Sequence, residues 1–248
     1  LDGLLYENEA GKFIGGITVQ YTHGQAHISS PHNSDLGRGK INTDGYGFGG
    51  TLTWYGDNGL YLDNQAQLNW YRSDLEYKGG HASLKNGKSN GFGYALSGEI
   101  GKRFAFDEQW ALTPQAQLRY SNARFNSFTD IFGAEVSRER ADSLEGRLGL
   151  SLDYQNIRKN EQGSMNRSSV YGIANLYNEF LDGTRVDVAS VKFTNKSERL
   201  WGGIGLGGSY NWNDDQYALY GEGSVNTSLQ HFGDSYAYKG SIGFRVKW

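Results

Sequence analysis

The chain ends on a regular alternation of apolar and polar residues over positions 238–248. Successive side chains of a β-strand point to opposite faces, so the alternation predicts one apolar and one polar face. The apolar face carries Ile242, Phe244, Val246 and Trp248, and the polar face carries Ser241, Gly243, Arg245 and Lys247. The chain repeats this pattern with polar residues where a soluble core needs apolar ones. The pattern therefore favours a transmembrane antiparallel β-barrel with an apolar outside and a wet interior.

The composition also favours an all-β membrane protein. Only 37% of the 248 residues are hydrophobic, which is low for a globular core, and the 14% that are aromatic argue against disorder. Without a run of about 18 apolar residues, no transmembrane helix is expected. The chain has no Cys, which excludes a disulfide scaffold and Cys-ligated zinc. A net charge of −3 gives no reason to expect nucleic-acid binding.

Further segments alternate in the same way, at residues 60–70, 92–103, 110–121 and 144–154. Short turns at 56–59, 107–108 and 213–215 are interspersed with longer stretches near 30–41, 77–90 and 126–139, as periplasmic turns and extracellular loops are in outer-membrane barrels. Large aromatic residues gather at strand ends, where interfacial girdles lie. These residues are Trp54, Trp70, Trp110, Tyr120, Tyr154, Trp212 and Trp248.

Counting back from a periplasmic C-terminus predicts about ten full strands. They lie near 13–29, 42–56, 60–76, 90–106, 109–125, 140–155, 168–181, 199–212, 215–229 and 235–248. Residues 182–198 are expected to form a small extracellular hairpin that includes Val186, Val188 and Val191, and residues 156–167 a long periplasmic link.

Residues 1–6 are expected to be the end of an eleventh strand. Bacterial single-chain barrels have an even number of strands and no free edges, so about one and a half strands are expected to be absent at the N-terminus. The first ten residues contain Asp2, Glu7 and Glu9 and are no signal peptide, which suggests a mature chain or a fragment.

The polar faces of the strands predict a mixed-charge wall around the interior, because charges that face lipid cost a few kcal/mol each. The residues expected to line the lumen are Glu99, Arg103, Arg119, Glu145, Arg147, Asp153, Gly203, Gly205, Gly207, Glu222, Arg245 and Lys247.

Several segments resemble the translocator domain of monomeric autotransporters, the type V secretion proteins of Gram-negative bacteria, and the adhesin-type members most of all. The segments are residues 43–47, 52–56, 59–63, 112–118 and 146–150. Each is a loose motif, but their order and spacing extend over nearly the whole chain. The resemblance implies a 12-stranded barrel in the outer membrane, threaded by a linker helix that joins it to an exported passenger. Residues 1–248 would then be a single translocator domain that lacks its first strand and much of its second.

The resemblance also implies roles for particular residues. The last eight residues are similar to the signal read by the outer-membrane barrel assembly machinery. Within them Ser241, Gly243, Phe244, Val246 and Trp248 are expected to matter for insertion, although most family members end in Phe. The inward glycines 203, 205 and 207 are expected to leave room for the lumenal helix.

Neither catalysis, nor a metal, nor a cofactor is expected. The chain contains no GxSxG or HExxH motif. Histidines such as His231 near Asp234 would suit an outer-membrane protease, and inward Asp153 and Asn226 would suit self-cleavage. Lone loop histidines are more often solvated surface residues, and the two inward residues match no specific self-cleavage pattern. The sequence thus predicts a non-enzymatic translocator and anchor in contact with outer-membrane lipid. The alternatives are a porin-like channel and a soluble β-sandwich binding module.

Overall fold

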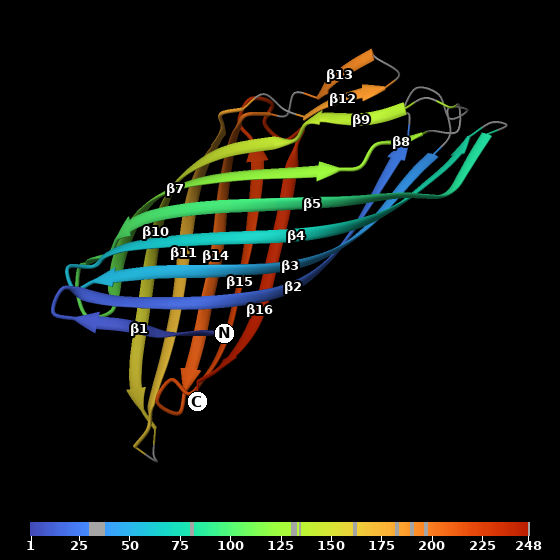
Figure 1. Cartoon of the computed structure of the whole chain (residues 1–248). Coiled ribbons are helices and arrows are strands. Elements are labelled where there is room, and N and C mark those ends of the chain that lie inside the picture. The colour runs from blue at the N-terminus through green and yellow to red at the C-terminus, as the bar shows by residue number, and fades with distance from the viewer. Residues whose placement is uncertain are drawn as a thin grey trace.

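The protein is an all-β molecule of antiparallel strands that form one long, curled sheet (Figure 1). The computed structural model describes residues 1–29, 38–79, 82–129, 133, 135–160, 163–181, 184–188, 191–195 and 198–247. None of these residues belongs to a helix long and apolar enough to cross a bilayer.

The main sheet runs along the chain almost in sequence order, as β1-β2-β3-β4-β5-β7-β10-β11-β14-β15-β16, with β6 paired to β7. The strands are β1 (Asp2–Asn8), β2 (Gly11–Ser29), β3 (Arg38–Gly56), β4 (Leu60–Gly79), β5 (Ala82–Lys102), β6 (Phe104–Ala105), β7 (Trp110–Phe125), β10 (Asp142–Lys159), β11 (Met165–Glu179), β14 (Leu200–Trp212), β15 (Tyr217–Ser228) and β16 (Tyr236–Val246). The ten long strands agree with the ten expected, and β1 is the additional strand end.

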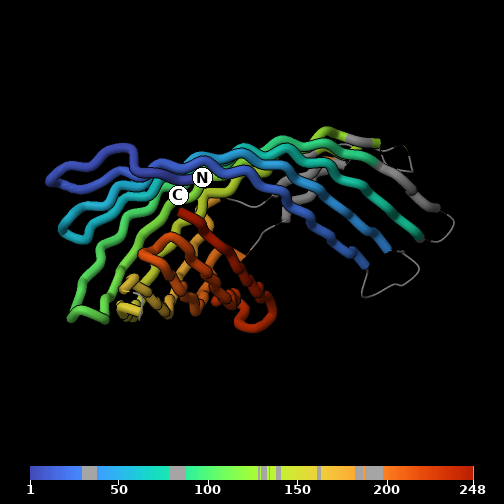
Figure 2. The backbone as a smooth tube through the Cα atoms, turned by 90° about the horizontal axis from the view of Figure 1, so that it is seen from below, coloured from blue at the N-terminus to red at the C-terminus, as the bar shows by residue number. Residues whose placement is uncertain are grey.

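The sheet is curled so that its first and last strands approach each other, as the two views in Figures 1 and 2 show. The N-terminus and the C-terminus lie close together in both views. Among the described residues no ladder joins β1 to β16, so the sheet is an open half-barrel.

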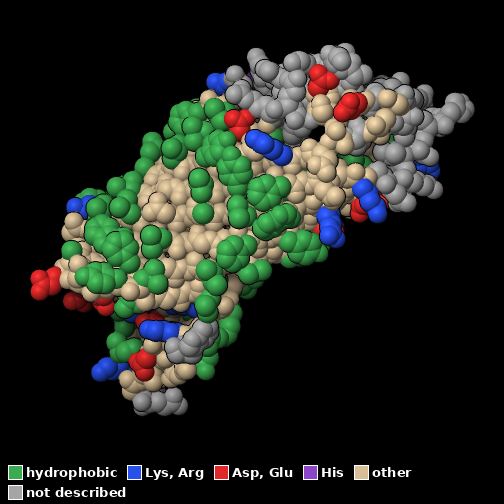
Figure 3. Space-filling model, in the orientation of Figure 1, with side chains coloured by type: hydrophobic (Ala, Val, Ile, Leu, Met, Phe, Trp, Pro, Cys, Tyr) green, Lys and Arg blue, Asp and Glu red, His purple; other side chains and the backbone are tan. Residues whose placement is uncertain are grey.

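The apolar side chains lie on the outside of this sheet and not in a central core. Among the described residues, the only buried hydrophobic ones are Ala111 and Ala218. Large apolar side chains are exposed instead, including Leu206 at 66% and Ile242 at 82%. Figure 3 shows this outer face, on which apolar side chains gather over the strands. Such a surface is stable where lipid, rather than water, surrounds it.

The expected periplasmic link at 156–167 is wrong, because the pairing of β10 with β11 continues from Tyr154↔Val170 to Lys159↔Met165. Beyond the ladder, the amide of Gly163 donates to the carbonyl of Asn160 (3.0 Å). The long loop expected at 77–90 is likewise mostly strand, since β4 and β5 remain paired as far as Gly79↔Ala82. Polar residues on both faces concealed these extensions, which project beyond the apolar band.

The predicted extracellular hairpin in 182–198 is confirmed as β12 (Thr184–Val188) paired with β13 (Val191–Asn195). It belongs to a second sheet of four strands, which the sequence did not reveal, in the order β13-β12-β9-β8. The added strands β8 (Phe128–Thr129) and β9 (Glu135–Arg140) lie in the region expected to be a loop at 126–139. The expected loop at 30–41 falls at 30–37 outside the described residues, and β3 begins within its last part.

The periplasmic turn between β14 and β15 has a left-handed backbone at three consecutive residues. Asn213, Asp214 and Asp215 have φ values of 55°, 56° and 64°. Asn and Asp tolerate this region better than other side chains, because they form local hydrogen bonds. The side chain of Asp214 accepts a hydrogen bond from the amide of Met165 (2.8 Å), and Asp215 pairs with Arg167 (3.1 Å). The turn is thereby tied to the neighbouring strand β11.

Candidate functional site

The candidate site is the inner face of the main sheet, opposite the exposed apolar rows. Strand register defines it: Glu99 faces Gln117 across β5 and β7, and Gln117 faces Arg147 across β7 and β10. The residues that follow these in sequence, such as Leu118 and Leu148, belong to the outer face and are exposed. Alternation along each strand therefore brings the polar residues of several strands together on one wall.

A buried ion pair lies at the centre of this wall. The Arg147 Nη2 is 2.6 Å from the Glu99 Oε2, and the two side chains are only 13% and 15% exposed. The Tyr61 hydroxyl donates to the Glu99 Oε1 (2.6 Å). Arg147 also donates to Asn175 Oδ1 (2.8 Å) and, through Nε, to Gln117 Oε1 (3.2 Å). The guanidinium is held in one position by residues from three neighbouring strands.

Other inner-face carboxylates are also hydrogen-bonded or paired. Asp153 accepts from the hydroxyls of Thr113 and Ser151, each at 3.0 Å. Glu222 accepts from the Tyr171 hydroxyl (2.7 Å) and lies 3.6 Å from Lys239 Nζ.

The pair Arg119–Glu145 is more open than the central pair. The two groups are 3.1 Å apart, and the Arg119 side chain is 53% exposed. Arg245 and Lys247 are exposed residues on the inner-face positions of the last strand and just beyond it.

Arg103 lies at the periplasmic end of the wall, where its amide donates to the Gly59 carbonyl (2.9 Å). It borders a hollow of about 470 Å³ on the inner face. The hollow is also lined by Tyr61, Asp153, Arg167 and Tyr171. The wall thus combines fixed charge pairs with a polar recess near its periplasmic mouth.

Several wall residues were not among those expected to act. Tyr61, Gln117, Tyr171 and Asn175 hold the carboxylates and Arg147 in place. A signal for Tyr61 was present, since it is an aromatic residue on the polar face between Leu60 and Leu62. The sequence-based prediction named charged residues and glycines on the wall, and it missed the neutral side chains that form hydrogen bonds with those charges.

The inner-face glycines are covered by the side chains of neighbouring strands. A Cβ on Gly203 would collide with the Asn226 carboxamide, and one on Gly207 would collide with the Tyr171 ring. On Gly205 a Cβ would be 3.1 Å from Ile173 Cγ2. The space that these glycines leave is used by the wall itself, at least in part.

Replacement of Gly207 by alanine is therefore expected to displace the Tyr171 ring and to break its hydrogen bond to Glu222. Because the new methyl group would collide with the end of the ring whose hydroxyl is bonded to Glu222, we expect a loss of about 1–3 kcal/mol in unfolding free energy. Urea unfolding in lipid vesicles, followed by tryptophan fluorescence, measures the change. Gly223→Ala is the matched control, because a Cβ there meets only the Lys239 carbonyl at 4.0 Å. Equal loss in both variants would contradict the packing argument.

The expected assembly signal occupies both faces of β16. Ser241 and Gly243 lie on the inner face, and a Cβ on Gly243 would collide with the Tyr220 ring. Phe244 and Val246 lie on the outer face, where the Phe244 ring stacks on Tyr217 with centroids 6.3 Å apart. Trp248 lies outside the described residues.

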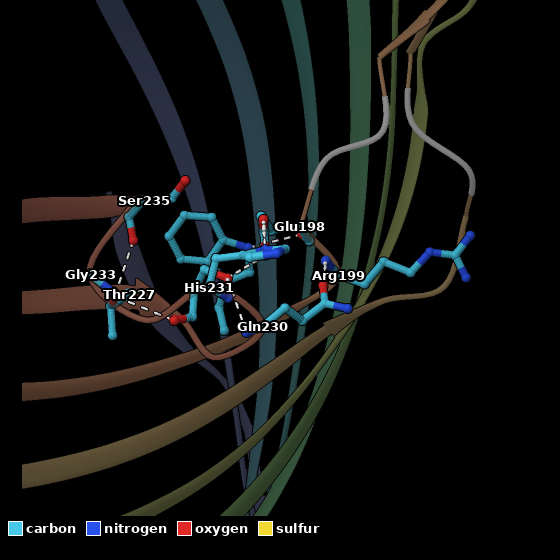
Figure 4. A network of polar contacts seen from close by, with 9 residues as sticks. Glu198, Arg199, Thr227, Gln230, His231, Gly233 and Ser235 are labelled. Atoms are coloured by element: carbon cyan, nitrogen blue, oxygen red, sulfur yellow. Dashed lines mark hydrogen bonds and ion pairs between the residues drawn. The ribbon is translucent and has the colours of Figure 1, made fainter.

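A network at the extracellular end connects the start of β14 to the turn between β15 and β16 (Figure 4). The Glu198 carboxylate accepts a hydrogen bond from the fully buried Ser228 and lies 2.7 Å from the His231 Nδ1. The Ser228 oxygen in turn accepts from the amides of Gln230 and His231, at 3.2 and 3.3 Å. Since Ser228 bonds Glu198 and not the imidazole, the three residues form a structural connection and not a Ser-His nucleophile.

This network makes the extracellular turn sensitive to acid. The Ser228 hydroxyl and then the His231 imidazole lower the pKa of Glu198 below its ordinary value of 4.5. A carboxylate with a depressed folded-state pKa stabilises the fold above its unfolded pKa, and this contribution is lost as the pH falls through the lower folded value. We expect proteolysis of the turn at 229–235 to increase as the pH falls below 4.5. The variant Glu198→Gln should be cleaved readily at all pH values, and a wild-type turn that is cleaved as fast as this variant at pH 7 would contradict this.

The residues behind the catalytic alternatives are engaged in other contacts. His231 pairs with Glu198, and Asp234 contacts it only through the backbone, where its amide donates to the His231 carbonyl (3.2 Å). Asp153 is held by two hydroxyls, and the carboxamide of Asn226 lies over Gly203. Within the described part of the chain, no group of three or more His, Asp or Glu residues could hold a metal ion.

The fold and the two faces of the sheet define an outer-membrane β-barrel domain, and comparison with known proteins gives its family. The family model described as the autotransporter beta-domain matches residues 2–224. The chain belongs to the autotransporter β-domain family. It is an outer-membrane translocator domain of a Gram-negative bacterium.

Two curated relatives illustrate the similarity. The chain is 47% identical over its whole length to the Adhesin BmaC autotransporter of Brucella suis biovar 1 (strain 1330), and spans 7% of that protein. It is 30% identical over 139 residues, 56% of the chain, to the pertactin autotransporter of Bordetella parapertussis (strain 12822), and this match spans 14% of that protein.

Two solved structures share the fold. The transport unit of the autotransporter AIDA-I from Escherichia coli matches 100% of this chain and 80% of its own, with a TM-score of 0.80 and 19% identity. The beta domain of the Bordetella autotransporter BrkA matches 98% of this chain and 86% of its own, with a TM-score of 0.63 and 20% identity.

Proposed function

We propose that the inner face of this domain holds the polypeptide linker, in helical form, that joins it to an exported passenger. The observation that carries the proposal is the buried Glu99–Arg147 pair with its ring of neutral partners. A wall whose charges are already satisfied presents a polar surface that does not trap a passing chain in one place. The wall therefore suits export followed by retention of a linker, and wall residues such as Arg103 and Asp153 border the recess at the mouth.

Three further features are part of the same proposal. The passenger is an adhesin, in view of the 47% identity to the barrel of an adhesin autotransporter. The barrel assembly machinery inserts the domain by reading the C-terminal residues Ser241, Gly243, Phe244, Val246 and Trp248. The domain itself acts by non-covalent binding and performs no catalysis.

Disulfide crosslinking in the full-length protein, with its passenger, tests where the linker lies. The domain has no cysteine, so engineered cysteines would be its only thiols. Gln65→Cys places a thiol on the inner face and Ala66→Cys places one on the outer face of the same strand. Cysteines are then introduced one at a time along the polypeptide between passenger and barrel.

We expect the inner-face thiol to form a disulfide with a periodic subset of linker positions, and the outer-face thiol to form none. Heat-modifiable migration on a gel shows that each variant has folded. Crosslinks from Ala66→Cys alone, or none from either position in folded protein, would refute a lumenal linker.

A further inference from the structure

One row of paired residues crosses the outer face of the sheet from β3 to β11. The register aligns Leu52 with Asn64, Asn64 with Gly98, Gly98 with Leu118, Leu118 with Gly146, and Gly146 with Asn178. Two positions of the row are glycines: Gly98 leaves the surface open, whereas the Phe180 ring lies over Gly146. The row therefore forms the floor of a depression on the lipid-facing surface.

The depression is a real hollow on both sides of this row. A hollow of about 650 Å³ lies on the Ala116 side of Leu118 and runs from Asn64 past Gly98 and Gly146 to Asn178. A second hollow, of about 640 Å³, lies on the Tyr120 side of Leu118 and shares the lining residues Asn64, Gly98 and Leu118 with the first. A third, of about 320 Å³, connects Asn64 to Trp54 near the periplasmic girdle. Figure 3 shows the same face, on which tan areas separate the apolar side chains.

Asn64 is one of two polar side chains in this row, with Asn178 at its far end. It is an exposed carboxamide between Leu62 and Ala66 in an outer-face row that is otherwise apolar as far as Trp70. Leu62 pairs with Trp54, which belongs to the periplasmic aromatic girdle. Asn64 is the next outer-face residue of β4 after Leu62, so it lies one step deeper in the membrane than this girdle. Within the described part of the chain, its side chain has no hydrogen-bond partner. An unpartnered amide in hydrocarbon is costly, and polar residues retained at such places mark candidate functional sites.

We propose that this outer hollow is a binding site for a diacyl glycerophospholipid. One acyl chain lies on the open floor at Gly98 and against the Phe180 ring that covers Gly146, and the Asn64 Nδ2–H donates a hydrogen bond to the ester carbonyl of that chain. The glycerol and head group then lie toward Trp54, through the third hollow. The lipid thereby supplies the partner that the protein does not.

The dimensions of the hollow favour a lipid chain over a second copy of the domain. From Asn64 to Asn178 the row crosses four strand intervals, roughly 19 Å at about 4.8 Å each. The hollow is recessed, whereas the outer wall of another barrel is convex and would bridge its rim. The floor and rim residues on the outer face are almost all apolar or Gly, including Ile100, Ala116, Leu148 and Leu176. A slender, flexible hydrocarbon fills such a recess.

Native mass spectrometry of the detergent-solubilised protein tests the proposal with a pair of probes. Dioleoylphosphatidylglycerol carries two ester carbonyls, and its dialkyl-ether analogue carries none. We expect the wild-type chain to retain one diester lipid with about tenfold higher affinity than the ether lipid, the value of one hydrogen bond in a dry site. The variant Asn64→Leu should lose this preference, because leucine donates no hydrogen bond.

Two glycine variants separate the hollow from the general lipid surface. A Cβ on Gly98 meets nothing within 4 Å except the Asn64 Oδ1 at 3.6 Å, so Gly98→Leu should fold and fill the floor. It should weaken both lipids about tenfold or more. Gly223→Leu, on the outer face of β15, is the matched control and should bind like wild type.

Equal affinity of the wild type for ester and ether lipids would overturn the role of Asn64. Unchanged binding in Gly98→Leu would overturn the location, and a retained protein dimer in place of lipid would assign the hollow to a second copy. Heat-modifiable migration establishes that each variant is folded before it is compared.

Discussion

Arg147→Met should lower the unfolding free energy of the domain by about 3–5 kcal/mol, because it leaves the buried Glu99 carboxylate without its cation. The two side chains are 13% and 15% exposed, so little water reaches the charge that remains. Asn175 and Gln117 would also lose their donor. Urea unfolding in phospholipid vesicles, followed by tryptophan fluorescence and by gel migration without boiling, measures the loss.

The matched control is Arg119→Met on the same wall. Arg119 pairs with Glu145 at 3.1 Å, but its side chain is 53% exposed, so water screens the interaction. We expect a loss below about 1 kcal/mol. The double variant Glu99→Met with Arg147→Met should recover much of the stability, since no charge stays buried. Similar losses in the two single variants would show that the central pair is solvated after all.

Leu206→Arg should cost about 2–4 kcal/mol of stability, although Leu206 is one of the most exposed side chains of the protein. It is 66% exposed and lies midway along β14 on the outer face. In water, a leucine so exposed is replaced by arginine at almost no cost. In the bilayer the guanidinium must leave water, so the size of the effect reports whether lipid covers this face. Unfolding in vesicles of about 30 Å hydrocarbon thickness provides the measurement.

Gln65→Arg is the control for this charge. Gln65 is exposed on the inner face, where its amide donates to the Asp63 carboxylate (2.7 Å). An arginine there stays in the wet interior beside a carboxylate, and the change should stay within about 0.5 kcal/mol. If Leu206→Arg were as harmless as Gln65→Arg, the outer face would not be embedded in lipid.

The alternation of side chains was sufficient to predict the strands that cross the membrane. Every expected full strand, from 13–29 to 235–248, is present, although some of its ends differ by several residues. Period two is a strong signal here because one face meets lipid and the other meets water along the same strand. The signal fades outside the bilayer, where both faces are polar. For that reason the extensions of β4, β5, β10 and β11 and the added strands β8 and β9 were not foreseen.

The site was predicted less completely than the fold. Register decided that Glu99, Gln117 and Arg147 lie in one cross-strand row, and a single chain does not state its register. The glycines 203 and 207 were read as empty space, but Asn226 and Tyr171 from neighbouring strands lie over them. Each of these contacts joins residues that are far apart in sequence.

The sequence by itself therefore determined the strands, the lipid-facing and polar faces, and the resemblance to a translocator, because these depend on the order of residues along one strand. The tertiary structure decided which charges pair, which glycines are covered, and that Asn64 lies on a hollow whose open floor is Gly98. These features depend on the stagger between strands, and that stagger is set only when the sheet curls and neighbouring side chains pack.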